Sequence, residues 1–332
     1  MMVFRSWLSV VLVLSWLACD HSQSRTPARA QPVDLQLQVS EPFRFVAYGD
    51  TRFTDPNDAE ASNPTARRIL VQAIADAHPA FVSVGGDLPY NGNDPNDWKV
   101  WDTETSIWRQ NKIPVYPAIG NHELHGDLKI ALANYFQRFP DLKESRYYSV
   151  RIANTMMLVL DTNLGVDSAP QAQWLAQKLD SLPADIDFVF LVFHHPPYTS
   201  SSDKYFGAGH SARRTEQELA NRLEARQQGM RARIVVFSGH VHNYERHEHG
   251  GITYFVTGGG GAHAYPIERA PGDPYQSKGV NYHYLLVEVD HRELKITMNR
   301  LDLSTGRPVW TQPDSVVIVA PAAMKANGAA AR

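Results

Sequence analysis

The chain of 332 residues contains one cysteine, Cys19, so no disulfide can form within it. It also lacks an excess of charge of one sign: 32 lysine and arginine residues face 35 aspartate and glutamate residues, for a net charge of −3. This balance gives no indication of a nucleic-acid partner or of binding to an anionic membrane surface. No internal repeat is visible. The hydrophobic content of 43% is ordinary for a globular protein with a large core.

The first residues are typical of a secretory signal peptide. Arg5 precedes a short apolar stretch, 7–18, which ends at Cys19. This stretch is shorter than the ~20 residues that a membrane-spanning helix needs, which favours a signal peptide over residues 1–18. The chain is therefore predicted to be exported, to the periplasm or the cell surface.

Cys19 lies where the signal peptide is expected to end. This position resembles a bacterial lipoprotein box, in which the thiol carries lipid, although Trp16 replaces the usual leucine. The alternative is a cleaved signal peptide and a free soluble enzyme. We expect a flexible tether over residues 19–40, a folded domain over 41–318 and a disordered tail over 319–332.

Strand-like and helical segments alternate along the first part of the chain, and strands dominate the rest. This order predicts an α/β domain with two packed sheets. The expected strands are 43–48, 81–84, 113–119, 147–151, 155–160, 188–193, 234–237, 252–257, 282–289 and 294–298. The expected helices are 64–77, 98–110, 171–182 and 213–228, the first with Asn63 as its N-cap.

Polar residues with the chemistry of metal ligands follow five of these strands. They are Asp50, Asp87 with Tyr90, Asn121 with His122, His194 with His195, and His240 with His242. Each alone has an ordinary explanation, such as a turn aspartate, a helix cap or a solvated loop histidine. The carboxyl ends of strands form the functional edge of α/β folds, so the five together predict one shared pocket.

The side chains of these residues predict a transition-metal site. Carboxylates, imidazoles, an amide oxygen and a phenolate suit first-row transition metals better than calcium. A carboxylate can also bridge two cations about 3.5–4 Å apart, which is the spacing of two-metal hydrolytic sites. Two such ions lower the pKa of a shared water and neutralise the charge on a transferred phosphoryl group.

The order of these motifs resembles the calcineurin-like metallophosphoesterase superfamily over about residues 43–261. The motifs are Gly49-Asp50, Gly86-Asp87-Leu88-Pro89-Tyr90, Gly120-Asn121-His122-Glu123, His194-His195-Pro196-Pro197 and Gly239-His240-Val241-His242. The second is similar to the purple acid phosphatase branch. The resemblance implies a four-layer α/β/β/α sandwich of two mixed sheets, with a dinuclear metal site at the strand carboxyl ends.

The resemblance also implies a role for each residue. Asp87 would bridge both metals, and the first metal would be bound by Asp50 and His242, joined by Tyr90. The second metal would be bound by Asn121, His240 and one histidine of the pair 194–195. We favour His194 because the family ligand is followed by x-Pro, and His195 remains the alternative because adjacent strand residues face opposite ways. His122 matches the histidine that protonates the leaving group or holds the phosphate.

Arg52 departs from the family pattern, because the superfamily's common D-x-H is here Asp50-Thr51-Arg52. If Arg52 points into the pocket, its guanidinium can hold a phosphate oxygen. If it points outward, it is a surface ion-pair residue. Thr199 to His210 is a candidate substrate loop, and His247 is expected to be solvated.

The resemblance implies an exported enzyme that hydrolyses phosphate monoesters of small molecules by in-line attack of a metal-bound hydroxide. Its cofactors would be two divalent or mixed-valence transition-metal ions of iron, manganese or zinc. A phosphodiesterase with the same site is the alternative, and a non-catalytic binding protein with this fold is a third reading. The membrane is an expected partner only through the lipid on Cys19.

Overall fold

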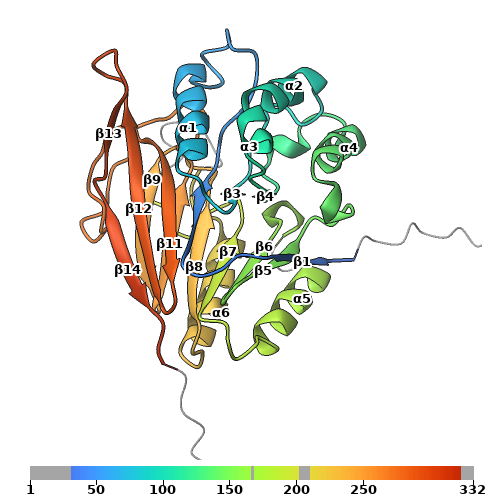
Figure 1. Ribbon diagram of the computed structural model, residues 1–332, viewed down its shortest axis with the longest axis vertical. Helices are drawn as coiled ribbons and strands as arrows, with labels where there is room; N and C mark the ends of the chain where they lie inside the picture. The colour runs from blue at the N-terminus through green and yellow to red at the C-terminus, as the bar shows by residue number, and fades with distance from the viewer. Residues whose placement is uncertain (1–30, 166–167, 202–209, 323–332) are drawn as a thin grey trace, which may run out of the picture. The chain divides into compact units, whose positions relative to one another are not determined.

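The computed structural model describes residues 31–165, 168–201 and 210–322, so the predicted signal peptide and Cys19 lie outside it. Two mixed seven-stranded sheets pack against each other, with helices on their outer sides (Figure 1). This arrangement confirms the predicted four-layer α/β/β/α sandwich. Among the described residues, no helix is both long and apolar enough to cross a membrane.

The first sheet has the strand order β1-β5-β6-β7-β8-β10-β9. These strands are β1 (Val33–Leu37), β5 (Tyr148–Ile152), β6 (Thr155–Val159), β7 (Phe188–Val192), β8 (Arg233–Ser238), β10 (Ile252–Thr257) and β9 (Tyr244–His249). The neighbours β6, β7, β8 and β10 run parallel, so β7 and β8 deliver their carboxyl ends to the same edge.

The second sheet has the order β13-β12-β11-β2-β3-β4, and β14 also pairs with β12. The strands are β13 (Val309–Thr311), β12 (Glu293–Asp302), β11 (Tyr282–Asp290), β2 (Phe43–Tyr48), β3 (Val82–Val84), β4 (Val115–Pro117) and β14 (Ser315–Val319). Because β2, β3 and β4 are parallel, their carboxyl ends also share one edge. The short β4 lies at the end of the sheet, as its prolines predict.

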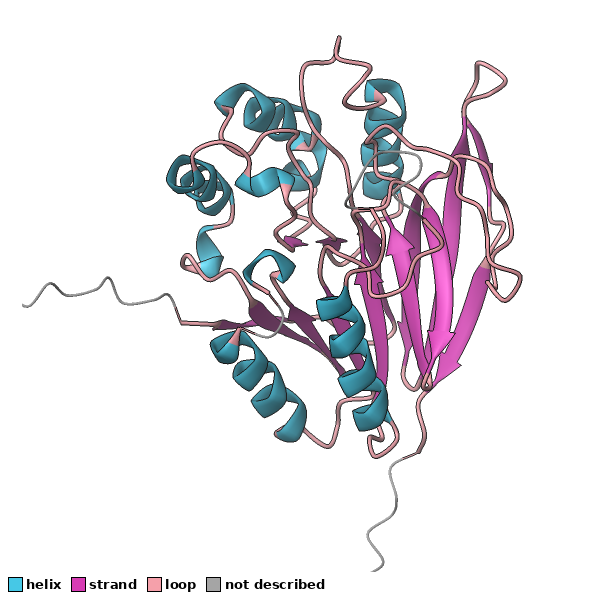
Figure 2. Ribbon diagram, turned by 180° about the vertical axis from the view of Figure 1, so that it is seen from behind, coloured by secondary structure: helices cyan, strands magenta, loops and turns pink. Residues whose placement is uncertain are grey.

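The helices cover both outer sides of the sandwich (Figure 2). The α-helices are α1 (Pro64–Asp76), α2 (Pro95–Glu104), α3 (Ser106–Gln110), α4 (Leu128–Arg138), α5 (Ala169–Asp180) and α6 (Arg214–Gln227). Short 3₁₀ turns are η1 (His122–Leu124), η2 (Pro140–Leu142) and η3 (Thr162–Leu164). As predicted, α1 begins after Asn63, whose side chain accepts a hydrogen bond from the Ala66 amide at 3.0 Å.

The period-2 alternation of β7 explains how the layers hold together. Phe188 and Phe190 belong to the apolar cluster between the sheets, whereas Val189 and Leu191 belong to the cluster with α5 and α6. Phe45 of the second sheet contacts Phe190 across the interface, with ring centroids 5.0 Å apart. Each such side chain, once buried, contributes roughly 1.5–3 kcal/mol of hydrophobic stabilisation.

Several predicted boundaries are wrong. The tether over 19–40 is not a tether throughout, because Val33–Leu37 form β1, which pairs in parallel with β5. The start predicted for the tail over 319–332 is wrong, because Val319 ends β14 and Ala320 is fully buried, while residues 323–332 lie outside the described part of the chain. The single helix over 98–110 is two helices that meet at Thr105. Neither α4 nor β9 was predicted.

Candidate metal centre

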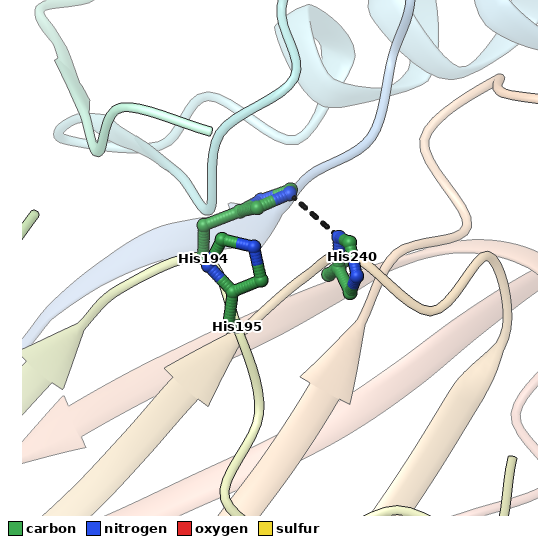
Figure 3. A group of neighbouring side chains, drawn as sticks. All are labelled: His194, His195 and His240. Atoms are coloured by element: carbon green, nitrogen blue, oxygen red, sulfur yellow. Dashed lines mark hydrogen bonds between the residues drawn. The ribbon is translucent and has the colours of Figure 1, made fainter. Parts of the chain in front are cut away.

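The five predicted strand ends converge where the two sheets meet along their carboxyl edges. β2, β3 and β4 lead to Asp50, Asp87 and Asn121, and β7 and β8 lead to His194 and His240. Two groups of ligand atoms result, each with all its atoms within 4.8 Å of one another. One group is His194, His195 and His240 (Figure 3), and the other is Asp50, Asp87 and His242.

The second-metal ligands predicted from the sequence lie in direct contact. The Nε2 atom of His194 is 3.0 Å from Asn121 Oδ1, 3.3 Å from Asp87 Oδ1 and 3.2 Å from His240 Nδ1. The His240 Nδ1 atom is itself 3.1 Å from Asn121 Oδ1. Four donor atoms therefore lie close together, from both sheets and from four loops.

The hydrogen bonds of the histidine pair favour His194 as the ligand. Its Nδ1 lies 2.9 Å from the Gly85 carbonyl, and this contact fixes the ring and directs Nε2 at the other donors. Metal-bound histidines commonly make such a bond through their second nitrogen. The Nδ1 atom of His195 instead pairs with Thr162 Oγ1 at 2.7 Å, and its ring lies 4.4 Å from that of His240. His195 thus lines the site beside the predicted ligands.

The first-metal group contains two buried polar atoms without a hydrogen-bond partner. They are Asp87 Oδ2 and His242 Nε2, and the latter is 3.7 Å from Asp50 Oδ1. The His242 ring is oriented by its Nδ1, which lies 2.9 Å from the His263 carbonyl. An orphaned buried polar atom is costly, so two of them aimed at one space indicate a ligand there. The residues present therefore fit a metal ion in this group.

The charges of the site support the same conclusion. Burial and the nearby Asp87 raise the pKa of Asp50 well above its usual value. Burial opposes ionisation of Asp87 as well, but His194, His122 and Arg52 hold the pKa of this carboxyl well below its usual value. The pKa values of Asp50 and Asp87 are therefore shifted in opposite directions. Both carboxyl groups can be ionised together only if a positive charge lies between them. Burial lowers the pKa of His242, which keeps it in the neutral form that binds metals.

The turns that present these residues adopt uncommon backbone conformations. Asp50, Asp87 and His240 have φ values of 57°, 55° and 70°, in the left-handed region. Such residues cost about 1–3 kcal/mol each and cluster at functional sites. The adjoining glycines are sterically required, because a Cβ on Gly239 would lie 2.3 Å from Asp50 Oδ2 and one on Gly120 would lie 2.2 Å from Asp87 Oδ1.

Glu123 holds the loop of Asp87 and the loop of Asn121 together, although the sequence analysis assigned it no role. Its fully buried carboxylate accepts hydrogen bonds from the amides of Asp87 at 3.0 Å, Leu88 at 2.5 Å and Gly120 at 2.6 Å. Burial and the nearby Asp87 raise its pKa to about 8. This one side chain fixes the loop of the bridging aspartate relative to the loop of Asn121.

Arg52 points into the site, which decides between its two alternatives. Its Nη2 atom is 3.6 Å from Asp87 Oδ2, and its side chain is only 15% exposed. The Arg52 carbonyl accepts a hydrogen bond at 3.0 Å from the buried Arg67, whose guanidinium also binds Glu104 at 2.8 and 2.9 Å. The segment that carries Arg52 is therefore anchored to α1 and α2.

His122 lies beside Asp87, the residue predicted to bridge the two metals. Its amide donates to Asp87 Oδ1 at 3.0 Å, and its Nε2 is 3.8 Å from Asp87 Oδ2. Its Nδ1 lies 2.5 Å from the Tyr90 carbonyl, which leaves Nε2 facing the site. Burial lowers the pKa of His122 to about 4.

Tyr90 is the one predicted ligand whose side chain lies apart from the two groups. Its ring packs beside that of His122 with centroids 5.4 Å apart, and the residue is 39% exposed. Among the described residues, neither Asp87 Oδ2 nor His242 Nε2 has a hydrogen-bond partner, so no hydrogen bond joins the Tyr90 phenol to these two atoms.

Three residues near the centre were not predicted as part of it. The His210 ring stacks on that of His240 at 4.9 Å, and the Tyr265 ring lies 5.5 Å from that of His242. His210 ends the candidate substrate loop, most of which (202–209) lies outside the described residues. His247 was expected to be solvated, but it is buried between Glu245 at 3.3 Å and Asp273 at 3.5 Å.

Comparison with known proteins places the same region in one family. Residues 43–244 match the model of the calcineurin-like phosphoesterase family. Purple acid phosphatase 1 of Ipomoea batatas is 26% identical over 178 residues, which cover 49% of this chain and 36% of that protein. A phosphoenolpyruvate phosphatase of Allium cepa is 26% identical over 213 residues, covering 58% and 41%. The chain therefore spans less than half the length of these two relatives.

The fold is also found in a solved structure. Purple acid phosphatase PPD1 from yellow lupin (Lupinus luteus) superposes with a TM-score of 0.62 at 19% identity, covering 85% of this chain and 54% of that one. At this identity the likeness concerns the fold alone, and it agrees with the two packed mixed sheets described above.

Proposed function

The chain belongs to the calcineurin-like phosphoesterase family, and on this basis we propose that it is a dinuclear-metal phosphatase that hydrolyses small phosphate monoesters. One observation carries the proposal: Asp87 lies between the two ligand groups, with Oδ1 directed at His194 and Oδ2 buried without a hydrogen-bond partner beside Asp50 and His242. The matches to a purple acid phosphatase and a phosphoenolpyruvate phosphatase support a reaction of this class.

The donor set divides between two transition-metal ions of iron, manganese or zinc. Asp87 would be shared, Asp50 and His242 would hold the first ion, and Asn121, His194 and His240 would hold the second. Bound there, the ions would supply Lewis acidity to the phosphoryl group and lower the pKa of the attacking water.

The remaining side chains orient the substrate. Arg52 extends its guanidinium beside Asp87 and can hold a non-bridging phosphate oxygen, because its planar fork matches phosphate geometry. His122 is fixed through Nδ1 and keeps Nε2 toward the site. Delivery of a proton from Nε2 to the departing oxygen needs the imidazolium form, which the lowered pKa of His122 favours only at acidic pH. Glu123 holds the loops of Asp87 and Asn121 in register.

The test compares hydrolysis of an aryl phosphate with that of its bis-aryl diester by the full chain prepared with manganese, zinc or iron. We expect faster turnover of the monoester. The Asp87→Asn variant should lose both turnover and bound metal by elemental analysis, whereas the Asp314→Asn control should keep both. Normal turnover in Asp87→Asn would overturn the metal-dependent mechanism, and a preference for the diester would overturn the monoester assignment.

We further propose export and a lipid on Cys19, which the apolar stretch 7–18 and the position of the cysteine support. Cells grown with labelled fatty acid should incorporate label into the wild-type chain and not into Cys19→Ser. Label in neither protein, with the chain recovered free in the exported fraction, would instead support a cleaved signal peptide.

A further inference from the structure

We infer that Tyr90 is a substrate-contact residue beside the departing group, and that the first metal is bound without a tyrosinate. The inference rests on the proposed function and extends it to the substrate: esters with a planar, aromatic leaving group. It departs from the assignment of Tyr90 to the first metal that its motif implies.

The backbone of Tyr90 is held on both sides, so the direction of its ring is part of the fold. Its amide donates to the Phe53 carbonyl at 3.0 Å, and its carbonyl lies 2.5 Å from His122 Nδ1. The ring then packs on His122 with a tilt of 38°. At 39% exposure, Tyr90 faces the mouth of the pocket more than its floor.

The Arg52 guanidinium lies beside Asp87 Oδ2, one of the two atoms of the first-metal group that have no hydrogen-bond partner among the described residues. Its Nη2 is 3.6 Å from Asp87 Oδ2, its amide donates to the Asp87 carbonyl at 2.9 Å, and Arg67 holds its own carbonyl. This leaves the first metal with three protein ligands, including the shared carboxylate, whereas the second has four. The nearby guanidinium also repels a cation, so the first metal should be the weaker bound.

The rings around His122 form an aromatic surface where the departing oxygen would lie. His122 contacts Tyr90 on one side and His125 on the other, with centroids 5.4 and 4.2 Å apart. Tyr90 and His125 are both exposed, while His122 is buried. A planar leaving group can stack on such a surface, whereas a short alkyl group gains little from it. Aryl monoesters should therefore be preferred over alkyl monoesters.

The metal part of the inference is tested by spectroscopy, independently of turnover. The full chain is loaded with ferric iron, and iron content and visible absorption are measured for the wild type and Tyr90→Phe. We expect equal iron content and no phenolate-to-iron charge-transfer band in either protein. A band in the wild type would overturn the tyrosinate-free site, as would a loss of iron in Tyr90→Phe.

The substrate part is tested by the ratio of kcat/KM for phenyl phosphate to that for glycerol 2-phosphate. In Tyr90→Ala we expect this ratio to fall about five- to tenfold, because the loss of one stacking contact lowers kcat/KM for the aryl ester more than for the alkyl ester. Tyr90→Phe should keep the ratio. The control Trp310→Ala removes an aromatic residue of similar exposure (40%) on β13 and should change nothing.

The outcomes separate this inference from the proposed function. An unchanged ratio in Tyr90→Ala would overturn the substrate-contact role while leaving phosphatase activity intact. Absence of turnover on both esters in the wild type would sink the proposed function, and the iron spectrum would still report on Tyr90.

Discussion

Replacing Glu123 with glutamine should weaken metal binding, although Glu123 is not itself a predicted metal ligand. One carboxylate oxygen of Glu123 accepts the amides of Asp87 and Gly120, and the other accepts the amide of Leu88. The glutamine side chain can direct its carbonyl oxygen at the amides of Asp87 and Gly120, but its NH₂ group then faces the amide of Leu88. Two donors would meet in a fully buried space.

The magnitude follows from these three hydrogen bonds. A buried donor left without a partner costs about 1–3 kcal/mol, and above pH 8, where Glu123 is ionised, the two remaining bonds also weaken because the acceptor loses its charge. The free energy of unfolding should therefore fall by about 2–4 kcal/mol. Because the same bonds place Asp87 against Asn121, metal affinity should fall about 10- to 100-fold, as for other residues that orient ligands.

Urea unfolding and calorimetric titration with zinc or manganese measure the two effects. The matched control is Asp314→Asn, which also removes one charge from a carboxylate with three hydrogen bonds, from the Tyr244 hydroxyl at 2.7 Å and the Arg246 guanidinium at 2.9 and 3.1 Å. It should be destabilised without a change in metal affinity. If Glu123→Gln bound metal as tightly as the wild type while losing stability, Glu123 would support the fold and not the site.

Three further substitutions test the folded state and the substrate contacts. Burial lowers the pKa of His283 to about 4, so the imidazole binds a proton more tightly in the unfolded chain than in the folded one. The free energy of unfolding should therefore be highest above pH 6.5 and fall by about 3 kcal/mol as the pH drops to 4. In urea unfolding, His283→Gln should remove this pH dependence between about pH 6.5 and 4. Arg52→Lys should lower kcat/KM about 10- to 100-fold with unchanged metal content, because a lysine cannot bind phosphate bidentately; an unchanged kcat/KM would remove Arg52 from substrate binding. Phe190→Ala should lower the free energy of unfolding by about 3–5 kcal/mol, since its ring lies between the sheets, and a loss under 1 kcal/mol would contradict that packing.

Most of the strands that carry the site could be predicted because each is a run of apolar residues that stops at a polar turn. β7 is the clearest example: all five of its residues are buried, and His194 follows almost at once. Such a run is recognisable without knowledge of its neighbours. The position of the site followed from the same feature, because parallel strands bring their carboxyl ends to one edge.

β1 could not be predicted in the same way, because its five residues alternate between half-buried and exposed. Its sequence, Val33–Leu37, alternates apolar and polar residues, a short period-2 signal that the tether prediction missed at the end of a polar segment. The strand pairs with β5, over a hundred residues along the chain. One of its side chains adds a contact to this pairing: Asp34 accepts a hydrogen bond from Ser149 at 2.6 Å. Whether such a short, half-buried segment forms a strand depends on the neighbouring strand with which it pairs.

The sequence motif also could not predict in which direction the Tyr90 side chain points after the turn. Tyr90 follows Asp87, whose φ is positive, and a single residue in that conformation redirects every side chain that comes after it. The sequence therefore identified Tyr90 as part of the site, and the turn decided which side of the site it occupies. The choice between His194 and His195 depended on a contact of the same kind, the bond from His194 Nδ1 to Gly85.

His247 shows why the outer loops are the hardest part to predict. It lies in the outermost strand of its sheet, in a polar sequence that reads as solvated, yet Glu245 and Asp273 enclose it. The same two carboxylates accept hydrogen bonds from Ser200, one from its amide at 2.7 Å and one from its hydroxyl at 2.5 Å. The start of the candidate substrate loop is thus fixed by buried polar contacts, which leave no hydrophobic period in the sequence. Contacts of this kind have to be derived from hydrogen-bond partners rather than from apolar patterning.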